Sequence, residues 1–173
     1  MWSLVDMAKC LMLKISFRAL FFIAIVFSLI SCGLHLRGVT DVAFNNIFIQ
    51  GNTLVISNNL KKSLNTSGVK VLDSPANAEL LLEMVGEESE KRILSLAGGG
   101  TVNEFELFYR VHYRTKVADA ATWSQIQTVE ARRDFTYSDA NLLAKQDEEK
   151  RLNENMRSDV ISGILRRLAA LKK

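Results

Sequence analysis

Residues 105–117, FELFYRVHYRTKV, carry the most regular hydrophobic pattern in the chain. The apolar side chains of the pattern are Phe105, Leu107, Tyr109, Val111, Tyr113 and Val117. The side chains between them are Glu106, Phe108, Arg110, His112, Arg114 and Lys116. A period of two predicts a β-strand with one face buried and the other face wet and basic.

Further strands are expected on both sides of this one. Residues 126–137 predict a neighbouring strand, since Val129, Ala131, Phe135 and Tyr137 fall on one side of it. Two apolar runs, 79–85 and 91–96, show little helical spacing and predict strands as well. The three glycines at 98–100 predict a turn.

The chain on the N-terminal side of these strands predicts a strand, a helix and another strand. The expected elements are a strand at 46–50, a helix capped by Asn52 or Thr53 and running to about Leu64, and a strand at 69–72. Gly68 is the expected helix stop.

The C-terminal part predicts a long amphipathic helix, capped by Ser138 or Asp139. Its apolar stripe consists of Leu152, Met156, Val160, Ile164, Leu168 and Leu171, reinforced by Ile161 and Leu165. The order of elements predicts an α/β fold. We expect a two-layer sandwich in which two helices pack on one face of a mixed, antiparallel-rich sheet of about four strands.

The first 31 residues have the pattern of a secretion signal. Lys9, Lys14 and Arg18 precede an uncharged run at 19–30. This run is shorter than the roughly 20 residues that a membrane-spanning helix needs. A buried core helix is the alternative, but the run has no polar face. Met12 could be the true start, since the preceding residues add little that a signal needs.

The end of the run, Leu29-Ile30-Ser31-Cys32, resembles the lipobox at which lipoprotein signals are cut. We therefore expect residues 1–31 to be a lipoprotein signal peptide and residues 32–173 to be one domain, lipid-anchored at Cys32. A diacylglycerol group on the thiol and an acyl chain on the freed amine would anchor it stably. Cys32 is the only cysteine of the expected mature chain, so that chain has no internal disulfide or thiolate metal cluster.

Charge and motifs exclude several classes of function. Without the expected signal the net charge falls from +3 to about +1, which argues against a general binder of polyanions, and we expect no nucleic-acid partner. The chain has two histidines, His35 and His112, and no HExxH, GxSxG or P-loop pattern. We therefore expect no enzyme, metal site or cofactor. A hydrolase is the least supported class, since no nucleophile–base pair can be read.

The basic strand face is the one feature of the pattern that could bind a ligand. Arg110, His112, Arg114 and Lys116 would lie about 6.6 Å apart along it, and Arg132 could lie on a neighbouring strand. Such a row of cations matches a multiply anionic ligand. The alternative is a solvated sheet face without a ligand.

Several short motifs, in order along the chain, resemble those of the LptE family of lipopolysaccharide-assembly lipoproteins. The motifs are CGLHLRG at 32–38, NEFEL at 103–107, RDFTY at 133–137, LLAK at 142–145, Glu148-Glu149, Met156 and RRL at 166–168. The first of these is similar to the family's mature N-terminus, and the last ones to its final strand and helix.

The resemblance implies a non-enzymatic outer-membrane lipoprotein. It would be lipid-anchored on the periplasmic side and would lie within the lumen of an LptD-like β-barrel. Its role there would be to plug the barrel, assist its assembly and help insert lipopolysaccharide at the cell surface. Gly33 after the cysteine, in place of aspartate, fits release to the outer membrane. The alternative is a periplasm-facing glycolipid-binding lipoprotein that works without a barrel.

The resemblance also implies a site for lipopolysaccharide phosphates. Lys145 matches the lysine of the family's Leu-Ala-Lys segment and is the strongest single candidate. The turn at 98–100 departs from relatives that carry an arginine there, and the nearest cations are Lys91 and Arg92. Arg110 and Arg114 of the basic strand face complete the candidate set.

Overall fold

The computed structural model describes residues 44–171. The expected signal peptide, the alternative start at Met12, the motif at 32–38 and the lipidation site at Cys32 lie outside the described residues. None of the helices in the described part of the chain combines the length and the apolar character that crossing a bilayer requires.

Five strands form a single sheet in the order β2-β1-β3-β4-β5. The strands are β1 (Asn46–Gly51), β2 (Lys70–Leu72), β3 (Leu80–Leu96), β4 (Val102–Val117) and β5 (Gln127–Thr136). β1 pairs in parallel with β2 and β3, whereas β3, β4 and β5 pair antiparallel. The sheet is therefore mixed and antiparallel-rich, as expected.

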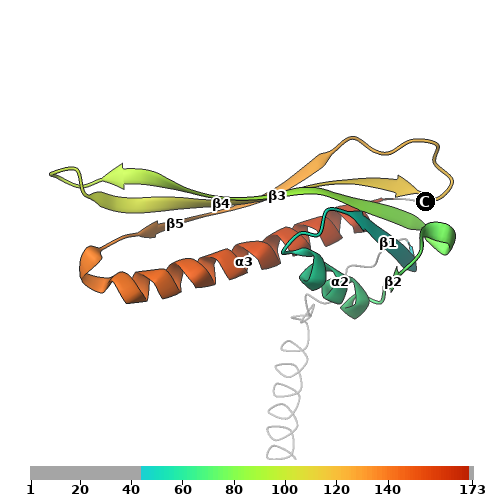
Figure 1. Cartoon of the computed structure of the whole chain (residues 1–173), viewed down its shortest axis with the longest axis horizontal. Helices are drawn as coiled ribbons and strands as arrows, with labels where there is room; N and C mark the ends of the chain where they lie inside the picture. Colours follow the sequence, from blue (N-terminus) through green and yellow to red (C-terminus); the bar gives the residue numbers. More distant parts are fainter. Residues whose placement is uncertain (1–43, 172–173) are drawn as a thin grey trace, which may run out of the picture. The chain divides into compact units, whose positions relative to one another are not determined.

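Two α-helices, α2 (Ser57–Thr66) and α3 (Leu142–Ala169), lie on the same face of the sheet (Figure 1). Short 3₁₀ helices, η1 (Pro75–Asn77) and η2 (Asp139–Asn141), precede β3 and α3. The predicted two-layer α/β sandwich is confirmed, with five strands rather than about four. The runs at 79–85 and 91–96 belong to one strand, because the polar residues between them also pair with β4.

The core lies between the helices and the sheet. The inward residues of β4 from Leu107 to Tyr113 are buried, as the alternation predicted, and so is most of the α3 stripe. These buried side chains include Leu107, Tyr109, Val111, Tyr113, Met156, Val160, Ile164 and Leu168. Burial of this apolar surface holds the two layers together. Val117, also expected on the buried face, is 47% exposed because it is the last residue of the strand.

The predicted helix caps were wrong. α2 begins at Ser57, and Asn52 instead donates from its side chain to the carbonyl of Val85. α3 begins at Leu142, with Asn141 at its N-cap and no side-chain hydrogen bond there. Gly68 does end α2, and its φ of 82° is a conformation that glycine adopts without steric cost.

Candidate functional site

Lys91 of β3 and Lys145 of α3 pair with two adjacent glutamates of α3, Glu149 and Glu148. The Nζ atom of Lys91, on β3, lies 2.6 Å from Oε2 of Glu149 and 4.1 Å from the ring centre of Phe105. The Nζ atom of Lys145 donates to Glu148 at 2.8 Å and to the Thr136 hydroxyl at 3.2 Å. The structure therefore brings together two candidate cations that are far apart in the sequence.

Arg92 lies on the opposite face of the sheet from Lys91. Its register partner on β4 is Glu106, whereas that of Lys91 is the buried Leu107. The guanidinium of Arg92 binds both carboxylate oxygens of Glu90, at 2.6 and 2.7 Å. Lys91 and Arg92 therefore cannot act from the same side of the hairpin, since neighbouring side chains of a strand point to opposite faces.

Arg110 and Arg114 lie on the outer face of β4, each beside carboxylates. Arg110 pairs with Glu130 of β5 and lies 3.4 Å from Glu90 and 3.8 Å from Glu88 on β3. Hydrogen bonding to Glu130 raises the pKa of Arg110 further above its usual range. Arg114 pairs with Glu83, which raises its pKa in the same way.

The outer face is thus charge-balanced, and the expectation of a basic face was wrong. His112 lies between Glu88 and the Thr128 hydroxyl, and Arg132 pairs with Glu106. Nor is the face wholly wet, because Phe108 is only 7% exposed and is covered by the guanidinium groups of Arg92 and Arg110. The glutamates come from β3, β4 and β5, and only the strand register places them beside the cations.

Several large apolar side chains, called here the apolar cluster, are exposed near one end of the sheet. Figure 1 places the turn between β3 and β4 at the same end as the start of α3. Large exposed apolar side chains at this end are Ile93, Leu94, Leu96, Leu142 and Leu143. Sequence reasoning missed the cluster. The signal was present for the two leucines at the start of α3, which precede Leu152, the first residue of the predicted stripe.

The end that carries Lys91, Lys145 and the apolar cluster combines cations with exposed apolar surface. This arrangement can contact an amphiphile whose phosphates sit beside its acyl chains. Among the described residues no group of histidine, cysteine, aspartate or glutamate side chains has the arrangement of a metal site.

Comparison with known proteins decides the family. The model of the family described as LptE: Lipopolysaccharide-assembly matches residues 44–168, which include every strand and almost all of α3. This chain belongs to the LptE family. The motifs at 103–107, 133–137 and 142–145 lie within the matched region, whereas the motif at 32–38 precedes it. The resemblance seen in the sequence is confirmed.

Solved structures of bacterial lipoproteins share the fold. An uncharacterized lipoprotein B from Nitrosomonas europaea is 35% identical, with a TM-score of 0.70 over 80% of this chain and 91% of that chain. The rare lipoprotein B from Shewanella oneidensis is 25% identical, with a TM-score of 0.65 over 73% and 95% of the two chains. A minor lipoprotein from Acinetobacter baumannii, 18% identical over 75% and 93%, shares the fold with a TM-score of 0.60. No curated protein matches the chain.

Membership of the LptE family gives the chain a role in lipopolysaccharide assembly. The family is one of lipopolysaccharide-transport lipoproteins that are not enzymes. The expected assignment as a lipoprotein of lipopolysaccharide assembly is therefore confirmed.

Proposed function

We propose that this chain is an outer-membrane lipoprotein, anchored through Cys32, that lies within the lumen of an LptD-like β-barrel. There it plugs the barrel, assists its assembly and takes part in moving lipopolysaccharide to the cell surface. The family match over residues 44–168 carries the proposal, because it covers nearly the whole described domain. A charge-balanced outer sheet face also suits the polar interior of a large barrel.

The alternative, a glycolipid-binding lipoprotein without a barrel, was motivated by the basic strand face. Arg110 lies beside three carboxylates, those of Glu88, Glu90 and Glu130, so an anionic ligand there would meet more negative than positive charge. That repulsion weakens the motive for a ligand site on this face. The barrel-bound role is the better-supported function.

Copurification tests the barrel partner. Isolation of the mature lipoprotein from outer membranes in mild detergent should yield a large β-barrel protein in a constant ratio to it. Depletion of the lipoprotein should also reduce lipopolysaccharide at the cell surface. Recovery of the lipoprotein alone, together with normal surface lipopolysaccharide after depletion, would contradict the proposal.

Within this function we place lipopolysaccharide phosphates at the end formed by Lys145 and Lys91. A phosphate there would replace Glu148 and Glu149 as the partner of the two ammonium groups, which lie 2.8 and 2.6 Å from those carboxylates. Charge-assisted hydrogen bonds to phosphate are strong enough for such an exchange. This site does not include Arg92, which lies on the outer face of the hairpin and is held by Glu90.

We predict that Lys145→Glu lowers lipopolysaccharide affinity by roughly tenfold or more, since it replaces an attractive charge by a repulsive one. The free energy of unfolding should fall by less than about 1 kcal/mol, because the Lys145–Glu148 pair is partly exposed to solvent. Binding is measured with purified lipopolysaccharide, and stability by urea denaturation.

Lys150→Glu is the matched control, because it makes the same charge change at an exposed position of α3. It should change affinity by no more than about twofold. If Lys150→Glu weakened binding as much as Lys145→Glu does, net charge rather than a site would explain the effect.

A further inference from the structure

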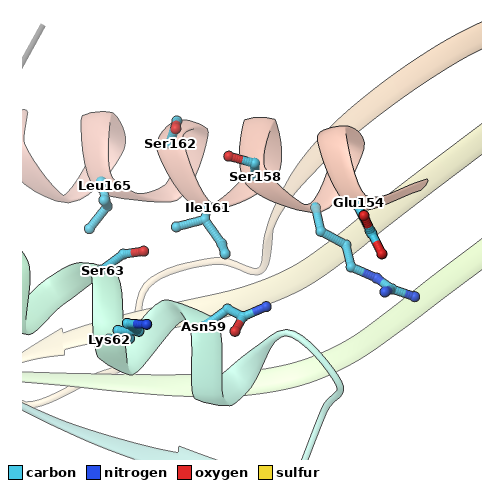
Figure 2. A pocket seen from close by; sticks show the side chains of 9 residues that line it. Asn59, Lys62, Ser63, Glu154, Ser158, Ile161, Ser162 and Leu165 are labelled. Atoms are coloured by element: carbon cyan, nitrogen blue, oxygen red, sulfur yellow. The ribbon is translucent and has the colours of Figure 1, made fainter. Parts of the chain in front are cut away.

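A groove of about 490 Å³ lies between α2 and α3, away from the cations discussed so far. This volume falls within the range of binding pockets for small ligands. In Figure 2, Ile161 and Leu165 point from α3 toward Asn59 and Ser63 on α2. Both helices therefore line the groove, and the apolar part of the lining comes from α3.

The polar lining of the groove can bind a peptide backbone. Asn59 and Ser63 come from α2, and Ser158 and Ser162 come from α3. Amide and hydroxyl side chains both donate and accept hydrogen bonds, so they can serve the N–H and the C=O groups of an extended chain. A phosphate dianion, by contrast, only accepts hydrogen bonds. The acceptor oxygens of these amide and hydroxyl side chains would then have no partner on the ligand.

The charges of the groove favour an acidic ligand. Lys62 and Arg157 line it together with one carboxylate, Glu154, and none of the three forms an ion pair with another described residue. Residues 52–72, which include all of α2, contain three lysines and no carboxylate. Glu154 would oppose a doubly charged phosphate more strongly than a singly charged carboxylate.

Arg157 differs from the arginines of the sheet. The Nε atoms of Arg92, Arg110 and Arg114 each donate to a glutamate. The Nε atom of Arg157 is buried and has no acceptor among the described residues. Its guanidinium lies 5.8 Å from the ring centre of Tyr109. Because Nε is covered, a ligand in the groove would meet the terminal nitrogens of the Arg157 guanidinium, and neither of them pairs with a carboxylate of the described residues.

We propose that the groove between α2 and α3 binds an acidic peptide segment of a partner protein. One carboxylate of the segment pairs with Arg157 and Lys62. The segment's backbone bonds to the amide and hydroxyl side chains, and its apolar atoms pack on Ile161 and Leu165. None of these contacts requires lipopolysaccharide, so the inference stands apart from the phosphate site at Lys145.

The test uses the mature lipoprotein in detergent micelles, labelled with ¹⁵N. The probe is an end-blocked hexapeptide of alternating glutamate and serine, and its glutamine counterpart is the uncharged control. The glutamate peptide should shift the amide signals of Ser63, Ser158 and Ser162, which line the groove. Arg157→Gln should weaken its binding by roughly tenfold or more, and Lys62→Gln should also weaken it.

Lys61→Gln is the matched control, since it removes the same charge from α2 at a residue that does not line the groove. It should change affinity by no more than about twofold. Three results would overturn the proposal: equal losses for Lys61→Gln and Lys62→Gln, equal binding of the glutamine peptide, or tighter binding of inorganic phosphate to the same residues. The last would assign the groove to a phosphate group. If Arg157→Gln did not fold, Lys62→Gln would still give the answer.

Discussion

Replacing Ile164 by alanine is expected to lower the free energy of unfolding by about 2–5 kcal/mol. Ile164 lies in α3 with no exposed surface, within the cluster that joins the helix to the sheet. Alanine would remove most of the buried side chain and leave a cavity that neighbouring groups fill only in part. Urea denaturation of the mature lipoprotein, followed by circular dichroism, gives the change.

Leu143→Ala provides the control for this prediction. Leu143 is in the same helix but is 79% exposed, so its truncation should change the free energy of unfolding by less than about 0.5 kcal/mol. If Ile164→Ala were as stable as Leu143→Ala, the apolar stripe of α3 would have to face solvent or a partner rather than the sheet.

Gly51→Ala is expected to destabilise the domain by roughly 2–5 kcal/mol, again measured by urea denaturation. Gly51 ends β1 with a φ of 97°, a conformation that L side chains rarely adopt. A Cβ atom there would meet the carbonyl oxygen of Met84 far inside van der Waals contact and would lie 3.0 Å from the Met84 nitrogen. Because both are backbone atoms of the paired strand β3, relief requires displacement of the strand itself.

Substitutions at two other glycines separate the cost of the positive φ angle from the cost of the clash with β3. Gly68 has a φ of 82°, and a Cβ atom added to it would meet no atom within 4 Å, so Gly68→Ala should show the backbone cost alone, about 1–2 kcal/mol. Gly98 has neither constraint, and Gly98→Ala should be nearly neutral. A Gly51→Ala protein as stable as the Gly68→Ala protein would show that β1 and β3 separate without cost.

The two stability predictions concern the framework that positions the candidate sites. Ile164 holds α3 on the sheet, and α3 carries Lys145, Arg157 and the exposed leucines. Gly51 marks the end of the parallel pairing of β1 with β3. Substitution of Ile164 or Gly51 should therefore disturb both the phosphate site and the groove. For this reason the binding tests use substitutions at the surface.

The sequence by itself determined the elements whose pattern repeats over short distances. The alternation at 105–117 predicted β4, the stripe from Leu152 to Leu168 predicted the buried side of α3, and the glycines at 98–100 predicted the hairpin turn. These predictions succeeded because the backbone of a strand or helix fixes which side chains share a face. Residue types typical of helix caps carried less information, and the predicted N-caps of both helices were wrong.

Only the tertiary structure decided which charges meet. Arg110 and Glu130 are 20 residues apart, and Lys91 and Glu149 are 58 apart, so no local pattern predicts either pair. The first pair depends on the register of β4 with β5, and the second on where α3 crosses the hairpin. The groove beside Arg157 likewise exists only because α2 and α3 pack on the same face of the sheet. Register and packing arise from contacts between distant segments, and they turned an expected basic face into a charge-balanced one.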